Sequence, residues 1–143
     1  MPLSKDERQQ FLAQPHIAAF AVAAGQDRGP LNLPIWYQYS PGAEVCVLTG
    51  AESQKMRCIR QAGRFSLMVQ RLEPTVRYVS VEGPVTRITP MTDELHREMV
   101  ARYLPPDKVD AYLRAAEAHG EQVAVYMRPE HWLSADLGDL SAL

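Results

Sequence analysis

The sequence has little of what marks a secreted, membrane-spanning or nucleic-acid-binding protein. Its 143 residues include two cysteines, Cys46 and Cys58, whereas a small disulfide-stabilised domain would carry more. No apolar run is long enough to span a membrane, and the first residues lack the apolar segment of a signal peptide. The net charge of -2 argues against nucleic-acid binding. We therefore expect one cytoplasmic domain, residues 1–143, that contacts neither membrane nor nucleic acid.

Familiar catalytic patterns are missing as well. There is no G-x-S-x-G nucleophile elbow, no G-x-G-x-x-G loop and no Walker loop. The histidines are far apart, which predicts no metal site: His16, His96, His119 and His131. We expect His96 and His119 on solvated helices and His131, beside Trp132, in a packed aromatic corner. No pair of carboxylates suggests acid–base work, so we assign no catalytic residue and expect any chemistry to come from a cofactor.

The apolar patterning predicts a mainly β, α+β fold. Strands are expected over 16–24, 31–39, 44–49, 64–70, 75–88 and 122–127, and helices over 5–13, 53–61, 92–103 and 106–118. Residues 129–137 are expected to lead into a polar tail. Hairpin turns between strands favour an antiparallel sheet, and closure into a barrel removes exposed edges. We therefore predict a six-stranded antiparallel barrel with peripheral helices.

Three local signals refine this prediction. Ser4 and Glu7 form an S-x-x-E capping box at the start of the first helix. Pro34 lies inside the second strand, and because proline cannot donate to a ladder, that strand is expected at an edge or a bulge. Gly83, followed by proline, predicts a kink or bulge in the long fifth strand.

The most informative stretch is 47–60, where an apolar strand ends at Thr49 and a helix opens at Ser53. Unpaired N–H groups and the positive dipole end make a helix N-terminus suited to phosphate, and the Ser53 hydroxyl and Lys55 ammonium would add to it. The arginines that follow, among them Arg57 and Arg60, suggest a local anion site. The alternative is that these basic side chains form only the solvated face of the helix.

An aromatic strand lies just upstream, at residues 33–39. Its Trp36 and Tyr37 could face a flat ring, and a ring beside a phosphate is what a flavin-type nucleotide needs. The alternative is that both aromatic side chains simply pack the barrel, because aromatic residues favour strands.

Taken in order, these motifs resemble the split β-barrel flavin and deazaflavin oxidoreductases, the superfamily named for pyridoxamine 5′-phosphate oxidase. The resemblance is carried by Ile35-Trp36-Tyr37, by Ser53-Gln54-Lys55 with its basic helix, and by the strand from Arg77 to Gly83. It covers about residues 8–90 and is nearest to the actinobacterial branch that uses the deazaflavin F-420. Two positions depart from the family pattern: Cys58 replaces an asparagine, and Ala62-Gly63 replaces Asp/Asn-Pro.

The resemblance implies a split β-barrel homodimer with cofactor sites at the subunit interface. It implies hydride transfer between F-420, or alternatively FMN, and a small organic substrate; a second alternative is a non-catalytic flavin- or haem-binding protein. The cofactor-binding positions that it implies are Pro34, Ile35, Trp36, Leu48, Thr49, Ser53, Gln54, Lys55 and Arg60, with Val76 and Tyr78 coming from the partner subunit.

Overall fold

The computed structural model describes residues 1–141 and residue 143. The strands are β1 (Ala18–Val22), β2 (Leu31–Ile35), β3 (Val45–Gly50), β4 (Arg64–Arg71), β5 (Val76–Pro90), β6 (Gln122–Met127) and β7 (His131–Gly138). The α-helices are α1 (Lys5–Ala13), α2 (Gln54–Ala62), α3 (Asp93–Tyr103) and α4 (Pro106–Ala116), and a 3-10 turn, η1, spans Glu117–His119. The predicted helices and the six predicted strands are all present, within a few residues at their ends.

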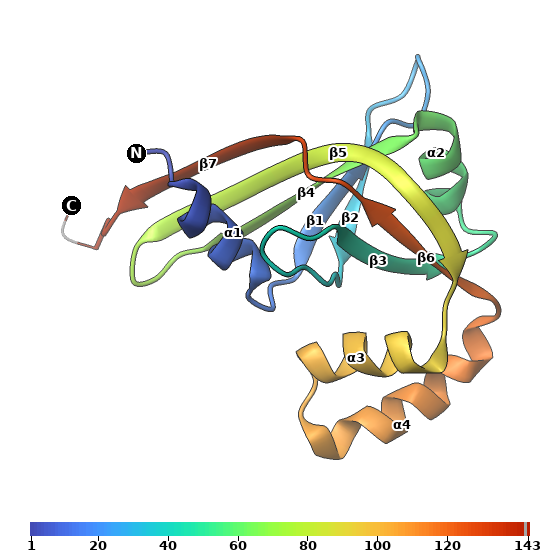
Figure 1. The fold of residues 1–143 in the computed structure, drawn as a ribbon. Helices are drawn as coiled ribbons and strands as arrows, with labels where there is room; N and C mark the ends of the chain where they lie inside the picture. The colour runs from blue at the N-terminus through green and yellow to red at the C-terminus, as the bar shows by residue number, and fades with distance from the viewer. Residues whose placement is uncertain (142) are drawn as a thin grey trace.

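The strands form one curled antiparallel sheet in the order β2-β1-β4-β5-β6-β3 (Figure 1). This path is the predicted six-stranded barrel. Its end strands, β2 and β3, approach each other where Gln38 and Cys46 exchange backbone hydrogen bonds of 2.9 Å. Pro34 lies on β2 opposite Ala19, so the proline occupies an end strand of the path, as its missing N–H requires.

Strand β5 is long enough to belong to both halves of the barrel. It pairs with β4 and β7 along its first part and with β6 after a bulge between Val85 and Arg87. At Gly83 the chain between β6 and β7 crosses so closely that a Cβ atom would lie 1.8 Å from the carbonyl oxygen of Arg128. The glycine predicted to mark a kink therefore permits this crossing.

Strand β7 is an addition to the predicted six, because residues 131–138 pair with β5 instead of forming a tail. Strands β4, β5 and β7 extend together beyond the barrel, toward the side where the termini lie (Figure 1). Trp132 packs edge-on against Tyr39, with ring centroids 6.3 Å apart. The expectation that His131 packs in this aromatic corner was wrong. Its side chain points away from the packed face, is 66% exposed and lies near Glu130.

The core fills the inside of the barrel, and the helices close its openings. Phe20 and Phe65 meet at a centroid distance of 5.0 Å, and Val47 and Leu67 are fully buried beside them. Cys46 is buried and unpaired, and burial raises the pKa of its thiol to about 11. No helix of the described chain is long and apolar enough to cross a membrane.

Capping residues mark the start of α1 and the end of α2. Ser4 and Glu7 make the predicted capping box on α1, with hydrogen bonds of 3.1 and 2.9 Å. Helix α2 ends at Gly63, whose φ of 72° is the left-handed conformation that glycine adopts at low cost.

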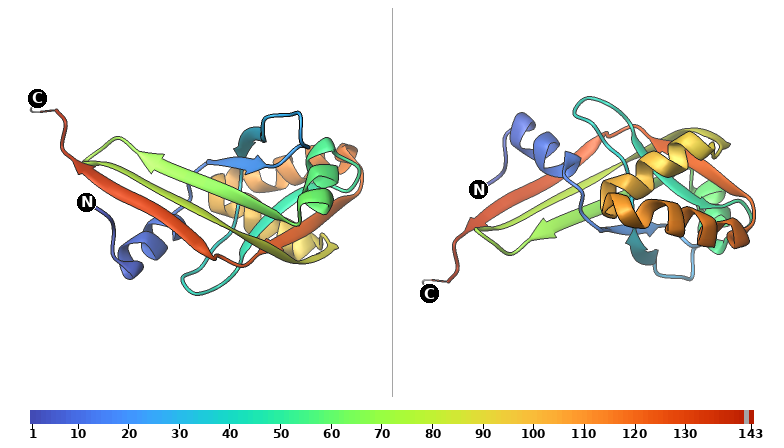
Figure 2. Two further views of the ribbon diagram at one scale, coloured as in Figure 1. Left: turned by 90° about the horizontal axis from the view of Figure 1, so that it is seen from above. Right: turned by 90° about the horizontal axis from the view of Figure 1, so that it is seen from below.

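Helices α3 and α4 form a hairpin between β5 and β6 that lies against one side of the barrel (Figures 1 and 2). The end of α3 fixes it there. The Tyr103 hydroxyl donates to the carbonyl of His16 at 2.8 Å and accepts from the backbone N–H of Tyr37 at 3.1 Å. The Arg102 guanidinium donates to the carbonyl oxygens of Ala13 and Gln14, both at 2.9 Å. The hairpin is thus hydrogen-bonded to the segment after β2, to the segment before β1 and to the end of α1.

Candidate functional site

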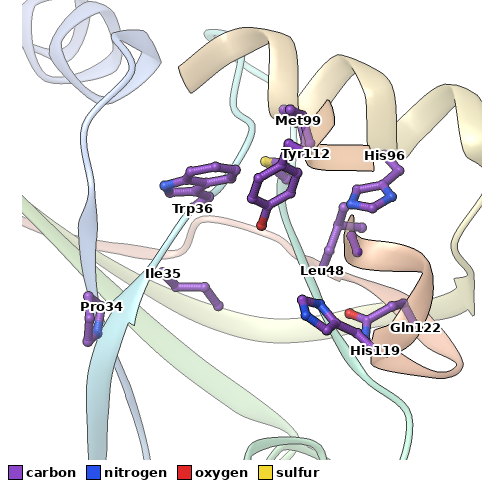
Figure 3. A pocket seen from close by; sticks show the side chains of 11 residues that line it. Pro34, Ile35, Trp36, Leu48, His96, Met99, Tyr112, His119 and Gln122 are labelled. Carbon is purple, nitrogen blue, oxygen red and sulfur yellow. The ribbon is translucent and has the colours of Figure 1, made fainter. Parts of the chain in front are cut away.

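A pocket of about 220 Å³ lies between the end strands of the barrel and the α3–α4 hairpin. Four of the sequence-predicted positions line it: Pro34, Ile35, Trp36 and Leu48. Figure 3 shows the three β2-side residues along one wall and Leu48 across from them, with side chains of the hairpin above. The structure thus brings the predicted ring-binding positions of two separate strands to one cavity.

Trp36 both lines this pocket and packs its roof. Its indole stacks on Tyr103, with centroids 4.8 Å apart and planes 6° apart, and meets Tyr112 at 5.4 Å. Parallel contact with one ring and tilted contact with another fixes the indole in place. Trp36 therefore packs against the hairpin and also lines the pocket.

The hairpin contributes pocket residues that the sequence reasoning missed. They are His96, Met99, Val100, Tyr112, Ala116 and His119, and Gln122 joins them from β6. The expectation of a solvated position was wrong for His96, which is half-buried in α3 because the hairpin folds back over the barrel, whereas His119 is exposed at a helix end as expected. Burial is the main cause that lowers the pKa of His96. The sequence did contain a signal for this contact. The spacing of His96, Met99, Val100 and Tyr103 puts them on one face of α3, and that face is directed toward the barrel.

The start of α2 is capped by Ser53. The Ser53 hydroxyl donates to the carbonyl of Gly50 at 2.9 Å and accepts from the N–H of Met56 at 3.1 Å. It also lies 3.2 Å from the hydroxyl of Thr49, which is itself 2% exposed. A hydroxyl has one donor and two acceptor sites, so these contacts engage Ser53 fully. Both residues shape the turn before α2, and neither hydroxyl is open to a ligand.

Lys55 lies in the first turn of α2 and is half-buried, next to the exposed Gln54. Burial lowers the pKa of its ammonium group. Within the described chain no carboxylate forms an ion pair with it. A partly desolvated cation without a counter-ion favours a bound anion.

Two arginines reinforce the positive charge at this helix start. Arg57 donates to the carbonyl of Glu52 at 3.0 Å, and Arg60 donates to the carbonyl of Ala51 at 3.4 Å. Both guanidinium groups therefore lie back over the turn that precedes α2, although both residues are exposed. Arg60 belongs to the last turn of α2, and its side chain reaches back to the helix start, where Arg57 also lies.

The helix start and the pocket adjoin through Gln122. This residue lines the pocket and pairs with Gly50, the last residue of β3. A Cβ atom at Gly50 would lie 3.7 Å from Gln122 Nε2 and an equal distance from the Ser53 Cβ. The apolar cavity and the cationic helix start are therefore consecutive parts of one surface.

Val76 and Tyr78 lie elsewhere in the same chain. They are at the beginning of β5, where they pair with Gly138 and Ala135 of β7. Figure 1 shows this end of β5 on the side of the molecule opposite α2. One chain therefore does not bring these two positions to the pocket.

No family model and no curated protein matches the sequence. Solved structures do match. An F420 reductase superposes with a TM-score of 0.68 at 23% identity, over 87% of this chain and 94% of that one. A FAD-binding protein from Mesorhizobium loti gives 0.63 at 17% identity, over 95% and 96%. A heme-binding protein from Mycobacterium smegmatis gives 0.64 at 17% identity, over 99% of this chain and 56% of that one.

The chain therefore has the split β-barrel fold of these structures, as the resemblance predicted. The names of these three proteins refer to F420, FAD and heme, respectively.

Proposed function

We propose that the protein is a homodimeric oxidoreductase that binds F-420 and transfers hydride between this deazaflavin and a small organic molecule. The observation that carries the proposal is the half-buried Lys55 without a counter-ion, next to a pocket whose walls come from β2 and β3. The fold supports it, because an F420 reductase has the same architecture.

The residues at the start of α2 fit the phosphate of such a cofactor. The Lys55 ammonium supplies the charge, and the N–H groups at the first turn of α2 lack partners within the helix. The Ser53 hydroxyl is excluded as a ligand by its internal hydrogen bonds, and its part is to cap the helix that presents Lys55. Arg57 and Arg60 add positive potential.

The pocket fits one edge of a ring system. Pro34, Ile35 and Leu48 offer apolar contact, which suits a conjugated ring. Its volume of about 220 Å³ is below the ~300–1,000 Å³ typical of complete ligand sites. One chain thus forms one wall, and we propose that a second copy closes the site with its Val76 and Tyr78.

The outer face of the sheet is suited to receive that second copy. Register places Ala19, Met68, Ser80 and Leu133 in one cross-strand row. Leu133 is 64% exposed, and Ile17 and Leu137 are 65% and 55% exposed. Small and apolar side chains along this sheet face favour a large interface, on the order of 2,000 Å² in total.

When bound, the deazaflavin would supply the hydride. The chain would bind the phosphate at Lys55, orient the ring against β2 and β3, and exclude water with the α3–α4 hairpin. His96 is the titratable group of the hairpin wall whose pKa burial lowers, so its imidazole is neutral at pH 7 and can accept a proton.

The second candidate function is haem binding without catalysis. His96 and His119 both line the pocket, and a neutral imidazole is a common axial ligand of haem iron. A heme-binding protein also shares the fold. FMN remains the alternative to F-420, because both need a phosphate site; the arginines at residues 57–87 favour F-420, whose oligoglutamate tail is anionic.

Spectroscopic titration of the purified protein with F-420, FMN and haem tests these proposals together. F-420 is expected to bind with micromolar or better affinity, with quenched fluorescence, and more tightly than FMN. A Soret band on adding haem, with no quenching of either fluorescent cofactor, would replace the oxidoreductase proposal with haem binding.

A further inference from the structure

A second cavity, of about 570 Å³, lies where α1, the turn before β3 and the chain between β6 and β7 meet. Its polar wall includes Lys5, Arg8, Glu44 and Arg128, and its aromatic wall includes Tyr39 and Trp132. It shares no lining residue with the pocket under the α3–α4 hairpin. The cofactor proposal therefore leaves this cavity without a role.

Arg8 is the central group of this cavity. Its guanidinium carbon lies 4.7 Å from the centroid of the Trp132 ring, so the indole holds the side chain in place. The Arg8 Nε atom is buried and has no hydrogen-bond partner in the described chain. Arg8 is also absent from the ion pairs formed there. The guanidinium is thus held in place without an anionic partner in the described chain, and such a group favours a bound carboxylate.

The charges around the cavity favour an anion. Glu44, the one carboxylate of its wall, is already engaged by the Thr86 hydroxyl and lies 3.6 Å from Arg87. Arg128 is matched by Glu130, 3.6 Å away. Lys5 and Arg8 are left as the unbalanced charges, three positions apart on one side of α1. Lys5 and Arg8 therefore give the cavity mouth an excess of positive charge.

The rest of the wall favours an organic anion over an inorganic one. Tyr39 and Trp132 meet at a ring angle of 68°, and Ala43 and Pro129 extend the apolar surface. The charged side chains therefore lie beside apolar ones. We propose that this cavity binds a small organic carboxylate, with its carboxylate on the Arg8 guanidinium fork and Lys5, and its apolar body against Trp132, Pro129 and Ala43.

Isothermal titration calorimetry of the full chain with benzoate tests the proposal. Benzoate is expected to bind at least about tenfold more tightly than benzamide, which keeps the ring and lacks the charge, and than phosphate, which lacks the apolar body. Arg8→Gln is expected to weaken benzoate binding about tenfold to a hundredfold. Arg28→Gln, in the exposed loop between β1 and β2, is the matched control and should leave binding unchanged.

Two further variants keep the test decisive. Arg8→Lys retains the charge but not the planar fork, so it should bind benzoate more weakly than the wild type even if Arg8→Gln does not fold. Benzoate bound against Trp132 should also change the tryptophan fluorescence of the protein. This change should persist in Trp36→Phe and disappear in Trp132→Phe. No heat of binding up to about 10 mM benzoate, wild-type affinity in both Arg8 variants, or tighter binding of phosphate than of benzoate would overturn the proposal. None of these readouts depends on F-420.

Discussion

The Trp36 indole lies parallel to the Tyr103 ring, at a centroid distance of 4.8 Å and an interplanar angle of 6°. This contact joins the end of β2 to the end of α3, and the Tyr103 hydroxyl adds hydrogen bonds to Tyr37 and His16. The pocket wall and its helical cover are thus fixed by the same residue. Removing only the Tyr103 hydroxyl therefore tests what its hydrogen bonds contribute to stability while the ring contact with Trp36 is kept.

Tyr103→Phe keeps the stacked ring but leaves the N–H of Tyr37 and the carbonyl of His16 without their partner. We expect the free energy of unfolding to fall by about 1–3 kcal/mol, measured by urea denaturation. Tyr112→Phe is the control, since the 37% exposed Tyr112 contacts Trp36 only through its ring. A loss of the same size in both variants would show that the hydroxyl bonds of Tyr103 do not hold the hairpin.

Gly83→Ala would place a methyl group 1.8 Å from the carbonyl oxygen of Arg128. Because that oxygen belongs to the backbone, β5 or the β6–β7 connection must shift. We expect a loss of about 3 kcal/mol or more in the free energy of unfolding, or failure to fold. Gly29→Ala has open space and should change stability by less than about 0.5 kcal/mol. Equal stability of the two variants would contradict the close crossing.

Asp136 gives the protein a specific sensitivity to acid. The Thr75 hydroxyl, the Gly138 N–H and Arg77 lower the pKa of its carboxyl to about 2. Because the folded-state pKa lies below the unfolded value of about 3.9, the stabilisation is complete above about pH 5 and is lost as the pH falls toward 2. Asp136→Asn should flatten this part of the curve of unfolding free energy against pH. Asp110→Asn, in an exposed pair with Arg97, should retain it.

Lys55→Ala is expected to weaken F-420 binding about tenfold to a hundredfold, measured by fluorescence quenching, because a hydrogen bond to a charged group contributes about 1.5–3 kcal/mol. Arg57→Ala is the control: its exposed guanidinium adds only a solvent-screened charge, so the change should alter the affinity by less than about threefold. Since burial lowers the pKa of Lys55, the affinity should fall with rising pH below the ordinary lysine value of about 10.4. If both variants behave alike, the basic residues of α2 form only a solvated face.

Leu133→Lys places a charge at the β7 end of the cross-strand row on the outer sheet face. Light scattering should report about twice the chain mass of 16.1 kDa for the wild type and the single-chain mass for the variant. Leu72→Lys is the control, because Leu72 is an exposed residue in the connection after β4. A wild-type mass of one chain at micromolar concentration would defeat both the dimer and the shared site.

Much of the fold could be predicted because its signals are local. The Ser4–Glu7 capping box, Pro34 in an end strand and the helix-ending Gly63 each follow from the chemistry of one or two side chains. The Val47–Arg60 stretch likewise predicted where α2 begins, because strand end and helix cap are close in sequence.

Strand β7 and the pocket roof could not be predicted in this way. The inward side of β7 carries Ser134 and Asp136, which are satisfied by the Leu3 N–H and by Arg77, so the usual apolar alternation is absent. The hairpin residues His96 and His119 reach the pocket only because Tyr103 and Arg102 bind segments more than 60 residues away in the chain. Such contacts are decided by tertiary packing.

The approach of β2 and β3 has a consequence for exchange and access. The Gln38–Cys46 bridge is where the described backbone links these two strands, and no ladder continues from it toward the pocket. Separating the pocket walls therefore breaks few backbone hydrogen bonds, whereas opening β4 from β5 would break an eight-pair register. Amide protons along this seam should exchange with solvent sooner than those of β4, and a flat ring can enter here while the rest of the barrel stays folded.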